Sequence, residues 1–101
     1  MAARKKGTAK APKIKVLFVC TGNTCRSPMA EYLFRDYLKK RKKLSKFTVT
    51  SAGICAQPGD TMSEHSQTVL RQRGAAFGAH KATQLTLKAA EAADLIVCMT
   101  A

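Results

Sequence analysis

A short segment of this 101-residue chain combines a cysteine, an arginine and a serine at a spacing suited to phosphate chemistry. It reads C-T-G-N-T-C-R-S over residues 20–27, so that Arg26 is the sixth residue after Cys20 and Ser27 follows directly. A thiolate can attack phosphorus and hold the phosphoryl group covalently, and a guanidinium group can bind two phosphate oxygens at once. The segment therefore predicts a phosphate-binding loop around a cysteine nucleophile.

The other side chains of the segment suit a loop that wraps an anion. Gly22 lets the backbone approach the anion closely, and Asn23 tolerates a left-handed conformation while its side chain fastens the loop. The pKa of a cysteine thiol, ordinarily about 8.5, falls to about 3.5–7.5 at a helix N-terminus beside arginine, and we expect this setting for Cys20. We predict Cys20 and Arg26 as catalytic residues, with the Ser27 hydroxyl donating to the thiolate. The predicted phosphate-binding residues are Thr21, Gly22, Asn23, Thr24, Cys25, Arg26 and Ser27.

The flanking sequence favours this interpretation over a chance spacing around a buried core cysteine. Residues 14–19 form a short β-branched and aromatic run, which is typical of a buried parallel strand. Ser27 and Pro28 then stand where a helix cap and first turn are favoured. A loop between a strand and a helix directs free N–H groups and the positive end of the helix dipole at an anion.

The rest of the chain alternates strands and helices. We expect Thr61 with Glu64 to cap the second helix and Gly74 to end it, and Thr86, with Thr83 as its rival, to cap the third. This order predicts an α/β fold with a parallel sheet, in which ligands bind beyond the carboxyl ends of the strands. The predicted strands are residues 14–19, 47–50 and 95–99, the last one buried, and the predicted helices are residues 28–43, 61–74 and 86–93.

Charge is concentrated in the first half of the chain, which carries a net charge of +12. Residues 1–46 hold 14 of the 18 basic side chains and two of the six acidic ones. Most of these basic side chains fall in two clusters, one in the N-terminal tail over residues 1–13 and up to Lys15, the other over residues 39–46. Such clusters can bind nucleic acid by counterion release. Because no nucleic-acid-binding motif accompanies them, we favour a disordered, solvated tail and a charged helix end over nucleic-acid contact.

Composition excludes several classes of protein. No apolar run approaches the roughly 20 residues of a membrane span, and no hydrophobic signal segment is present, so we expect a cytoplasmic location. Cysteines occur at positions 20, 25, 55 and 98, without a C-x-x-C pair or histidines at ligand spacing, which argues against a zinc site. We interpret Cys98 as a small buried hydrophobic residue.

Residues 16–31, V-L-F-V-C-T-G-N-T-C-R-S-P-M-A-E, resemble the signature of the low-molecular-weight protein-tyrosine phosphatase family. The Ser-Ala-Gly at residues 51–53, the spacing from Gly74 to His80 and residues 93–100 are similar to later parts of the family pattern. The resemblance spans residues 14–101. It implies a flavodoxin-like, three-layer fold and hydrolysis of phosphoproteins or small phosphomonoesters without metal or cofactor.

The resemblance also implies roles for single residues. By motif position Cys20 is the nucleophile, Arg26 the phosphate clamp, Ser27 the stabiliser of the thiolate and Asn23 the residue that organises the loop. Cys25 matches a neighbour that forms a reversible disulfide with the nucleophile and protects it from over-oxidation.

The chain departs from the family pattern beyond its third strand. The family's general acid is the aspartate of an Asp-Pro pair, which this chain lacks, and Asp36, Asp60 and Asp94 do not match it. The family's fourth strand and closing helix have no counterpart either. We therefore expect residues 14–101 to be the N-terminal two-thirds of the domain in a truncated chain, with turnover reduced about 10²–10⁴-fold for leaving groups that need a proton.

The sequence leaves two phosphorylated side chains as candidate substrates. Thr24 stands where eukaryotic members usually carry an aliphatic residue, and it resembles the bacterial branch that includes protein-arginine phosphatases. Phosphotyrosine and phosphoarginine are both retained, and residues 54–57 are expected to rim the pocket. The alternatives are a non-catalytic phosphate-binding or interaction module and, less favoured, a thiol-dependent arsenate reductase, which needs further redox cysteines after the third strand.

Overall fold

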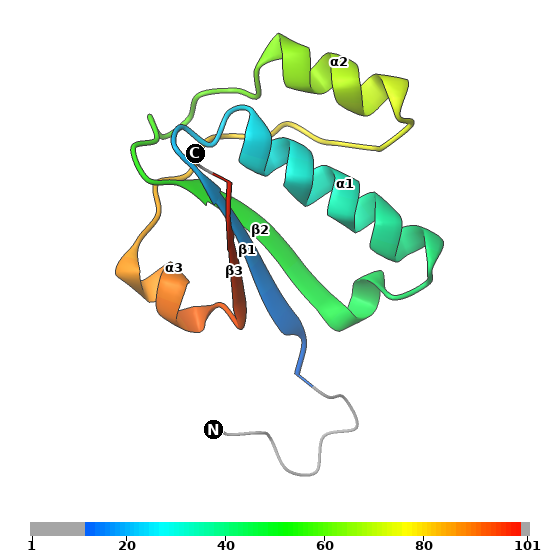
Figure 1. The fold of residues 1–101 in the computed structure, drawn as a ribbon, viewed down its shortest axis with the longest axis horizontal. Helices are drawn as coiled ribbons and strands as arrows, with labels where there is room; N and C mark the ends of the chain where they lie inside the picture. The colour runs from blue at the N-terminus through cyan, green and yellow to red at the C-terminus, as the bar shows by residue number, and fades with distance from the viewer. Residues whose placement is uncertain (1–11, 100–101) are drawn as a thin grey trace.

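The computed structural model describes residues 12–99, so the predicted basic tail lies outside the described residues except for Pro12 and Lys13. Three strands in these residues form one parallel sheet, as expected, and their order is β2-β1-β3 (Figure 1). The elements are β1 (Ile14–Cys20), α1 (Arg26–Lys40), the short 3-10 helix η1 (Leu44–Lys46), β2 (Phe47–Gly53), α2 (Glu64–Gln72), α3 (Leu87–Ala92) and β3 (Leu95–Cys98).

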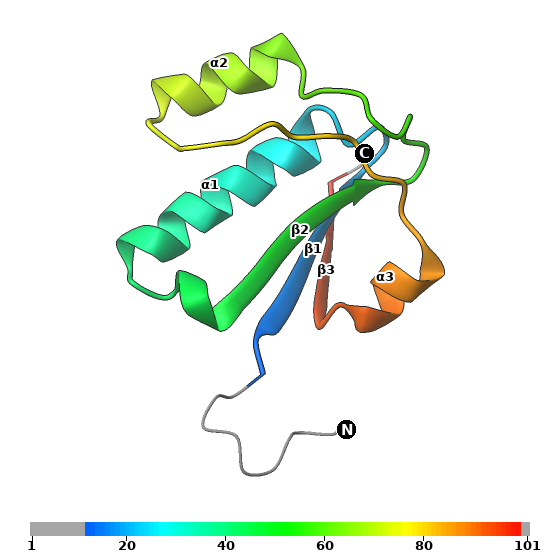
Figure 2. The ribbon, with the colours of Figure 1, turned by 180° about the vertical axis from the view of Figure 1, so that it is seen from behind.

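The sheet is covered by helices on both faces, which confirms the predicted α/β architecture. Figures 1 and 2 show α1 and, outside it, α2 on one side of the strands and α3 on the other. On the α1 side, the Phe34 ring packs edge-on against Phe18 of β1 and Phe47 of β2, with centroid distances of 5.8 and 6.0 Å. A second core lies between α1 and α2, where Leu70 is fully buried.

Parallel pairing brings the carboxyl ends of β1 and β2 to the same edge of the sheet. The register places Cys20, the last residue of β1, directly opposite Gly53, the last residue of β2. The predicted second strand, residues 47–50, was therefore too short, because the backbone continues to pair with β1 as far as Gly53.

Two helices begin at other residues than predicted. The first starts at Arg26 and ends at Lys40, and its N-cap residue Cys25 makes no side-chain capping bond. Ser27 lies inside the first turn, and its hydroxyl bonds to Cys20 and Asn23 rather than capping the helix. The second helix is capped by Ser63 rather than Thr61, with the Ser63 hydroxyl accepting a 3.2 Å hydrogen bond from the Ser66 N–H.

Two other predicted helix ends are confirmed, the end of the second helix at Gly74 and the cap of the third helix at Thr86. Gly74 adopts a φ of 70° just after α2, a conformation that glycine tolerates best. Thr86 caps α3 by accepting a 3.0 Å hydrogen bond from the Ala89 N–H. Its rival Thr83 does not cap a helix, and its hydroxyl donates to the Lys81 carbonyl at 3.3 Å instead.

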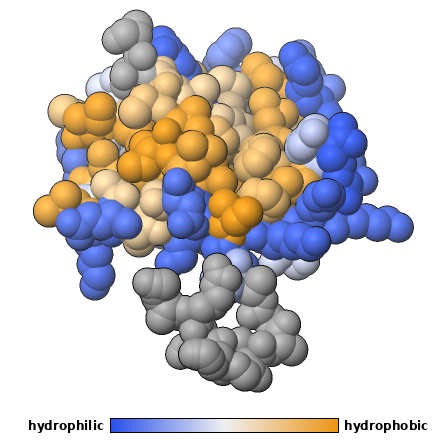
Figure 3. Space-filling view, turned by 60° about the horizontal axis from the view of Figure 1, so that its bottom comes forward, coloured by the Kyte–Doolittle hydropathy of each residue, from blue (hydrophilic) through white to orange (hydrophobic). Residues whose placement is uncertain are grey.

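The prediction of a buried third strand was wrong. Leu95 and Ile96 of β3 are 54% and 41% exposed, and Cys98 is exposed as well, so it is not a core residue. β3 is an edge strand, and the described residues place no element over its outer side. Figure 3 shows hydrophobic side chains gathered on the face of the molecule seen from below.

None of the helices in residues 12–99 combines the length and apolar character that crossing a membrane requires.

Candidate active site

The loop between β1 and α1 forms a hollow at the carboxyl edge of the sheet. The hollow has a volume of about 370 Å³, within the range of small-molecule sites. Five of the predicted phosphate-binding residues line it together with Cys20, whereas Asn23 and Ser27 are buried beneath the loop. The lining residues are Cys20, Thr21, Gly22, Thr24, Cys25, Arg26 and Met99.

Hydrogen bonds converge on the Cys20 sulfur. Cys20 Sγ lies 2.9 Å from Ser27 Oγ and accepts a 3.3 Å bond from the Asn23 N–H. Burial alone raises the pKa of the Cys20 thiol, but the Ser27 hydroxyl and the backbone N–H groups of Ser27, Asn23 and Gly22 outweigh it, so the pKa is lowered below its ordinary value. The site therefore favours a thiolate at Cys20.

Asn23 is the centre of the loop's hydrogen bonds. It is fully buried and adopts a φ of 57°, in the left-handed region predicted for it. Its Nδ2 donates to Ser27 Oγ at 2.8 Å and to Ser51 Oγ at 3.0 Å. Its Oδ1 accepts a 2.8 Å bond from the Thr83 N–H. His80 Nε2 lies 2.8 Å from its main-chain oxygen. These bonds satisfy a side chain that would otherwise be costly to bury.

The direction of these bonds determines where the Ser27 proton goes. Ser27 Oγ accepts from Asn23 Nδ2, so its single hydroxyl proton remains available for Cys20 Sγ. Ser51 is oriented in the same way, because its hydroxyl donates to Glu31 Oε1 at 2.6 Å and accepts from Asn23. The arrangement thus supplies a proton donor to the thiolate.

A buried carboxylate on α1 anchors this chain of bonds. Glu31 is 5% exposed, and its second oxygen pairs with Arg35 at 2.7 Å. Sequence reasoning missed the roles of Glu31 and Ser51. The Ser-Ala-Gly at the end of the second strand was the available signal, since parallel pairing brings that strand end beside the loop.

Gly53 packs against the loop more closely than any side chain would permit. A Cβ atom at this position would lie 2.7 Å from the Thr21 carbonyl oxygen and 2.9 Å from the Asn23 nitrogen. The residues that follow bond to the loop, with the Ile54 N–H donating to the Cys20 carbonyl and the Cys55 N–H to the Thr21 carbonyl, at 2.9 and 2.8 Å. Ile54 and Cys55 therefore support the loop from outside, and none of residues 54–57 lines the hollow that they were predicted to rim.

Arg26 lies at the hollow, where its guanidinium bonds to a backbone carbonyl. Its Nη1 donates to the Met99 carbonyl oxygen at 2.8 Å, and the side chain is exposed. The lowered pKa of Cys20 therefore comes from hydrogen bonds rather than from the Arg26 charge. Cys25 also lines the hollow with a free thiol, and its disulfide with Cys20 stays a prediction.

None of the carboxylates in the described residues lines the hollow. Asp94 accepts a 2.8 Å bond from the Lys15 N–H near the other end of β1, and Asp36 pairs with Lys40 at 2.9 Å. Residues 12–99 also contain no group of three or more histidine, cysteine or acidic side chains that could hold a metal ion. The chemistry available in the hollow is that of a thiolate, hydroxyl groups, backbone N–H groups and one guanidinium.

Comparison with known proteins identifies relatives of the chain. The family model "Low molecular weight phosphotyrosine protein phosphatase" matches residues 15–101. A protein-arginine-phosphatase of Bacillus subtilis is 42% identical over 85 residues, which are 84% of this chain and 55% of the relative. The low molecular weight protein-tyrosine-phosphatase YfkJ of the same organism is 42% identical over 89 residues, or 87% of this chain and 57% of the relative.

Solved structures agree with these relatives. The crystal structure of YfkJ from Bacillus subtilis has a TM-score of 0.85 at 39% identity, over 90% of this chain and 58% of that one. A low molecular weight protein tyrosine phosphatase from T. tengcongensis has a TM-score of 0.79 at 40% identity, over 86% of this chain and 58% of that one. The chain thus spans a little more than half the length of the relatives it matches.

Replacement of Gly53 by alanine tests the close packing at the loop. The added Cβ meets backbone atoms that cannot move aside independently, so we expect Gly53→Ala to destabilise the fold by about 1–3 kcal/mol in urea unfolding. Gly78→Ala is the matched control, because its Cβ would enter open space and should be neutral or stabilise by up to about 1 kcal/mol. Equal stability of the two variants would contradict the close approach.

The Ser27 hydroxyl can be tested through the pH dependence of Cys20 reactivity. In a background with Cys25, Cys55 and Cys98 changed to serine, iodoacetamide reports the Cys20 thiolate alone. Ser27→Ala removes the donor and should raise the Cys20 pKa by about 1–2 units, the equivalent of one charge-assisted hydrogen bond. Ser45→Ala, at an exposed serine, should leave the pKa unchanged. An unchanged pKa in Ser27→Ala would rule out this role.

Proposed function

Because this chain belongs to the low molecular weight phosphotyrosine protein phosphatase family, we propose that Cys20 removes phosphoryl groups from phosphorylated protein side chains. The observation that carries the proposal is the Cys20 thiol at the carboxyl end of β1, hydrogen-bonded to Ser27 and to a backbone N–H in a hollow large enough for phosphate. An ordinary core cysteine needs neither the hollow nor a lowered pKa.

The reaction proceeds in two displacements at phosphorus. The Cys20 thiolate attacks the phosphorus atom, the bond to the leaving group breaks, and a cysteinyl-phosphate forms. Water then attacks the same phosphorus, inorganic phosphate leaves, and the sulfur recovers its electron pair as a thiolate. The Ser27 hydroxyl, 2.9 Å from Sγ, stabilises that departing thiolate by a hydrogen bond.

Arg26 is the residue we propose to clamp the transferring group. Its guanidinium donates to the Met99 carbonyl at 2.8 Å, a bond it must exchange for phosphate oxygens when substrate binds. The Met99 carbonyl then serves to hold the side chain at the mouth of the hollow in the absence of an anion. The loop N–H groups and the N-terminus of α1 supply the remaining anion-binding groups.

The leaving group has no carboxylic acid to protonate it in the hollow formed by residues 12–99. Substrates whose leaving group departs as a stable anion should therefore react best, since general acid catalysis contributes about 10²–10⁴-fold where a proton is needed. A p-nitrophenyl ester is such a substrate. The same observation favours a second candidate function, a module that binds phosphate without turning it over.

Phosphotyrosine and phosphoarginine are the two substrate classes we retain. Relatives at the same 42% identity carry the names protein-arginine-phosphatase and protein-tyrosine-phosphatase. Thr24 lines the hollow and offers a hydroxyl beside the phosphate position, which suits the N–H groups of a phosphorylated guanidinium. Parallel assays on phosphotyrosine and phosphoarginine peptides distinguish the two.

The covalent intermediate is tested with p-nitrophenyl phosphate. Mixing enzyme with excess substrate should release a rapid burst of p-nitrophenolate, about one equivalent per Cys20, before slower steady turnover. Cys20→Ala should abolish both phases, whereas Cys55→Ala, at an exposed cysteine outside the hollow, should keep them. A burst that survives in Cys20→Ala would overturn the nucleophile assignment. Phosphate binding with neither burst nor turnover in the unaltered chain would favour the binding module.

A further inference from the structure

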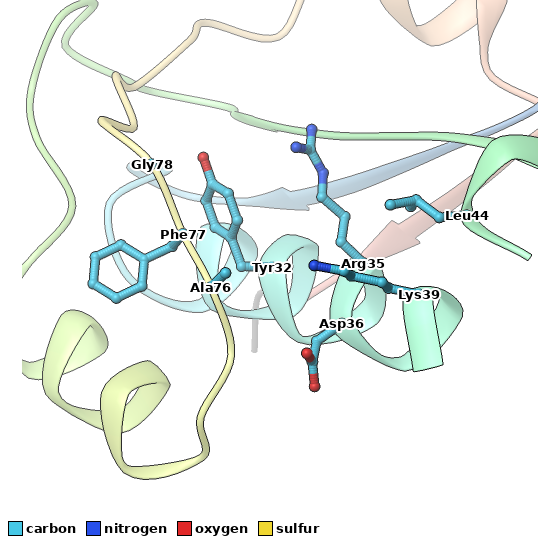
Figure 4. Close-up of a pocket in the computed structure, with 8 residues that line it drawn as sticks. All are labelled: Tyr32, Arg35, Asp36, Lys39, Leu44, Ala76, Phe77 and Gly78. Atoms are coloured by element: carbon cyan, nitrogen blue, oxygen red, sulfur yellow. The ribbon is translucent and has the colours of Figure 1, made fainter. Parts of the chain in front are cut away.

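A second hollow lies on the outer side of α1, away from the loop. It has a volume of about 280 Å³ and separates α1 from the segment that follows α2 (Figure 4). We call it the α1 pocket. The residues that line it include Tyr32, Arg35, Asp36, Lys39, Phe77 and Gly78.

The Tyr32 ring lines the α1 pocket, and the Phe77 ring lies on the other side of the segment over residues 76–78 (Figure 4). The rings of Tyr32 and Phe77 meet edge to face, with centroids 6.3 Å apart and an interplanar angle of 66°. A Cβ atom placed on Gly78 would meet no atom within 4 Å, so the space above this residue is open. Rings favour offset or edge-on contact with other rings. The Arg35 guanidinium lies over the Tyr32 ring, 5.3 Å from its centroid, so a further aromatic ring would contact the rest of the Tyr32 ring.

One positive charge in the α1 pocket is left without a partner. Arg35 is paired with Glu31 at 2.7 Å, and Asp36 is paired with Lys40 at 2.9 Å. In the part of the chain that the structure describes, Lys39 forms no salt bridge. Figure 4 shows the Lys39 side chain lying back along α1, with its ammonium group towards Tyr32 and the stem of Arg35.

The surroundings reinforce this positive charge. The chain turns from α1 into the basic residues 41–43, which raise the local potential for an anion. A volume of 280 Å³ lies just below the 300–1,000 Å³ typical of sites for drug-sized ligands, so a ligand with a single ring is the appropriate size.

We propose that the α1 pocket is a binding site for a small aromatic carboxylate. The ring of the ligand packs against Tyr32, over the open backbone at Gly78, and its carboxylate accepts hydrogen bonds from the Lys39 ammonium group. A neutral aromatic molecule of the same shape would gain the ring contacts alone. The site is separate from Cys20 and does not depend on phosphatase activity.

The wall of the α1 pocket is in contact with the phosphate loop through one residue. The Tyr32 ring meets the His80 ring edge-on at 6.3 Å, and His80 Nε2 lies 2.8 Å from the Asn23 main-chain oxygen. A ligand bound against Tyr32 therefore contacts the neighbour of His80, and His80 in turn bonds to the loop at Asn23. We expect ligand binding to change the surroundings of Asn23 as well, but less than those of Tyr32.

Nuclear magnetic resonance titration tests the proposal, with phenylacetate as the probe and phenylacetamide as its neutral isostere. Saturating inorganic phosphate is present throughout, so that the hollow at Cys20 is occupied. We expect the largest amide shifts at residues 36–39 and 76–78, smaller ones at Asn23, and at least about tenfold tighter binding of the carboxylate. Largest shifts at residues 20–27, or equal binding of the two probes, would overturn the proposal.

Two variants locate the site. Lys39→Met keeps the aliphatic stem and should reduce phenylacetate binding about tenfold, to the level of phenylacetamide. Lys43→Met removes the same charge from a residue outside the pocket and should change binding less than twofold. Gly78→Leu fills the open space and should abolish binding of both probes. Unchanged phenylacetate binding in Lys39→Met or in Gly78→Leu would show that the ligand lies elsewhere.

Discussion

The candidate site depends on the buried side chain of Asn23. A left-handed residue in a tight loop is unfavourable for most side chains, and a buried amide is costly unless its polar atoms are bonded. Asn23 meets both conditions because partners from α1, β2 and the segment before α3 converge on it. Together with the backbone bonds from Ile54, Cys55 and Ser63 to the loop, these partners hold the N–H groups around the sulfur. The fold thus brings segments that are far apart in the sequence into contact with this one amide.

The Asn23 side-chain amide also determines the direction of the hydrogen bonds in the loop. Because it donates to Ser27 and to Ser51, the two hydroxyl protons are directed outwards, one to Cys20 and one to Glu31. The thiol is therefore shifted towards its charged form by hydrogen bonds, against the effect of burial. This accounts for a lowered thiol pKa in a site where the guanidinium that lines the hollow, that of Arg26, is bonded to a backbone carbonyl.

Local patterns in the sequence predicted much of this arrangement, and contacts between distant segments account for the rest. The loop, the strand before it and the parallel fold follow from residues 14–28, where motif, strand signal and helix signal are adjacent in the chain. The Ser-Ala-Gly at residues 51–53 was noted, but the roles of Ser51, Gly53 and Glu31 were not predicted, because they come from contacts that form only when β2 pairs with β1. Likewise, an apolar run predicts a strand but not what covers it, and β3 proved to be exposed.

The central claim is that Asn23 acts on the thiol through Ser27, and a double-mutant cycle tests it directly. The measured quantity is the Cys20 pKa in Asn23→Ala, in Ser27→Ala and in the combined variant, with folding of each verified by circular dichroism. If the amide works by orienting the hydroxyl, the combined variant will have the same pKa as Ser27→Ala alone. Additive shifts of the two single variants would contradict the account, because they would show that Asn23 and Ser27 act on the sulfur independently.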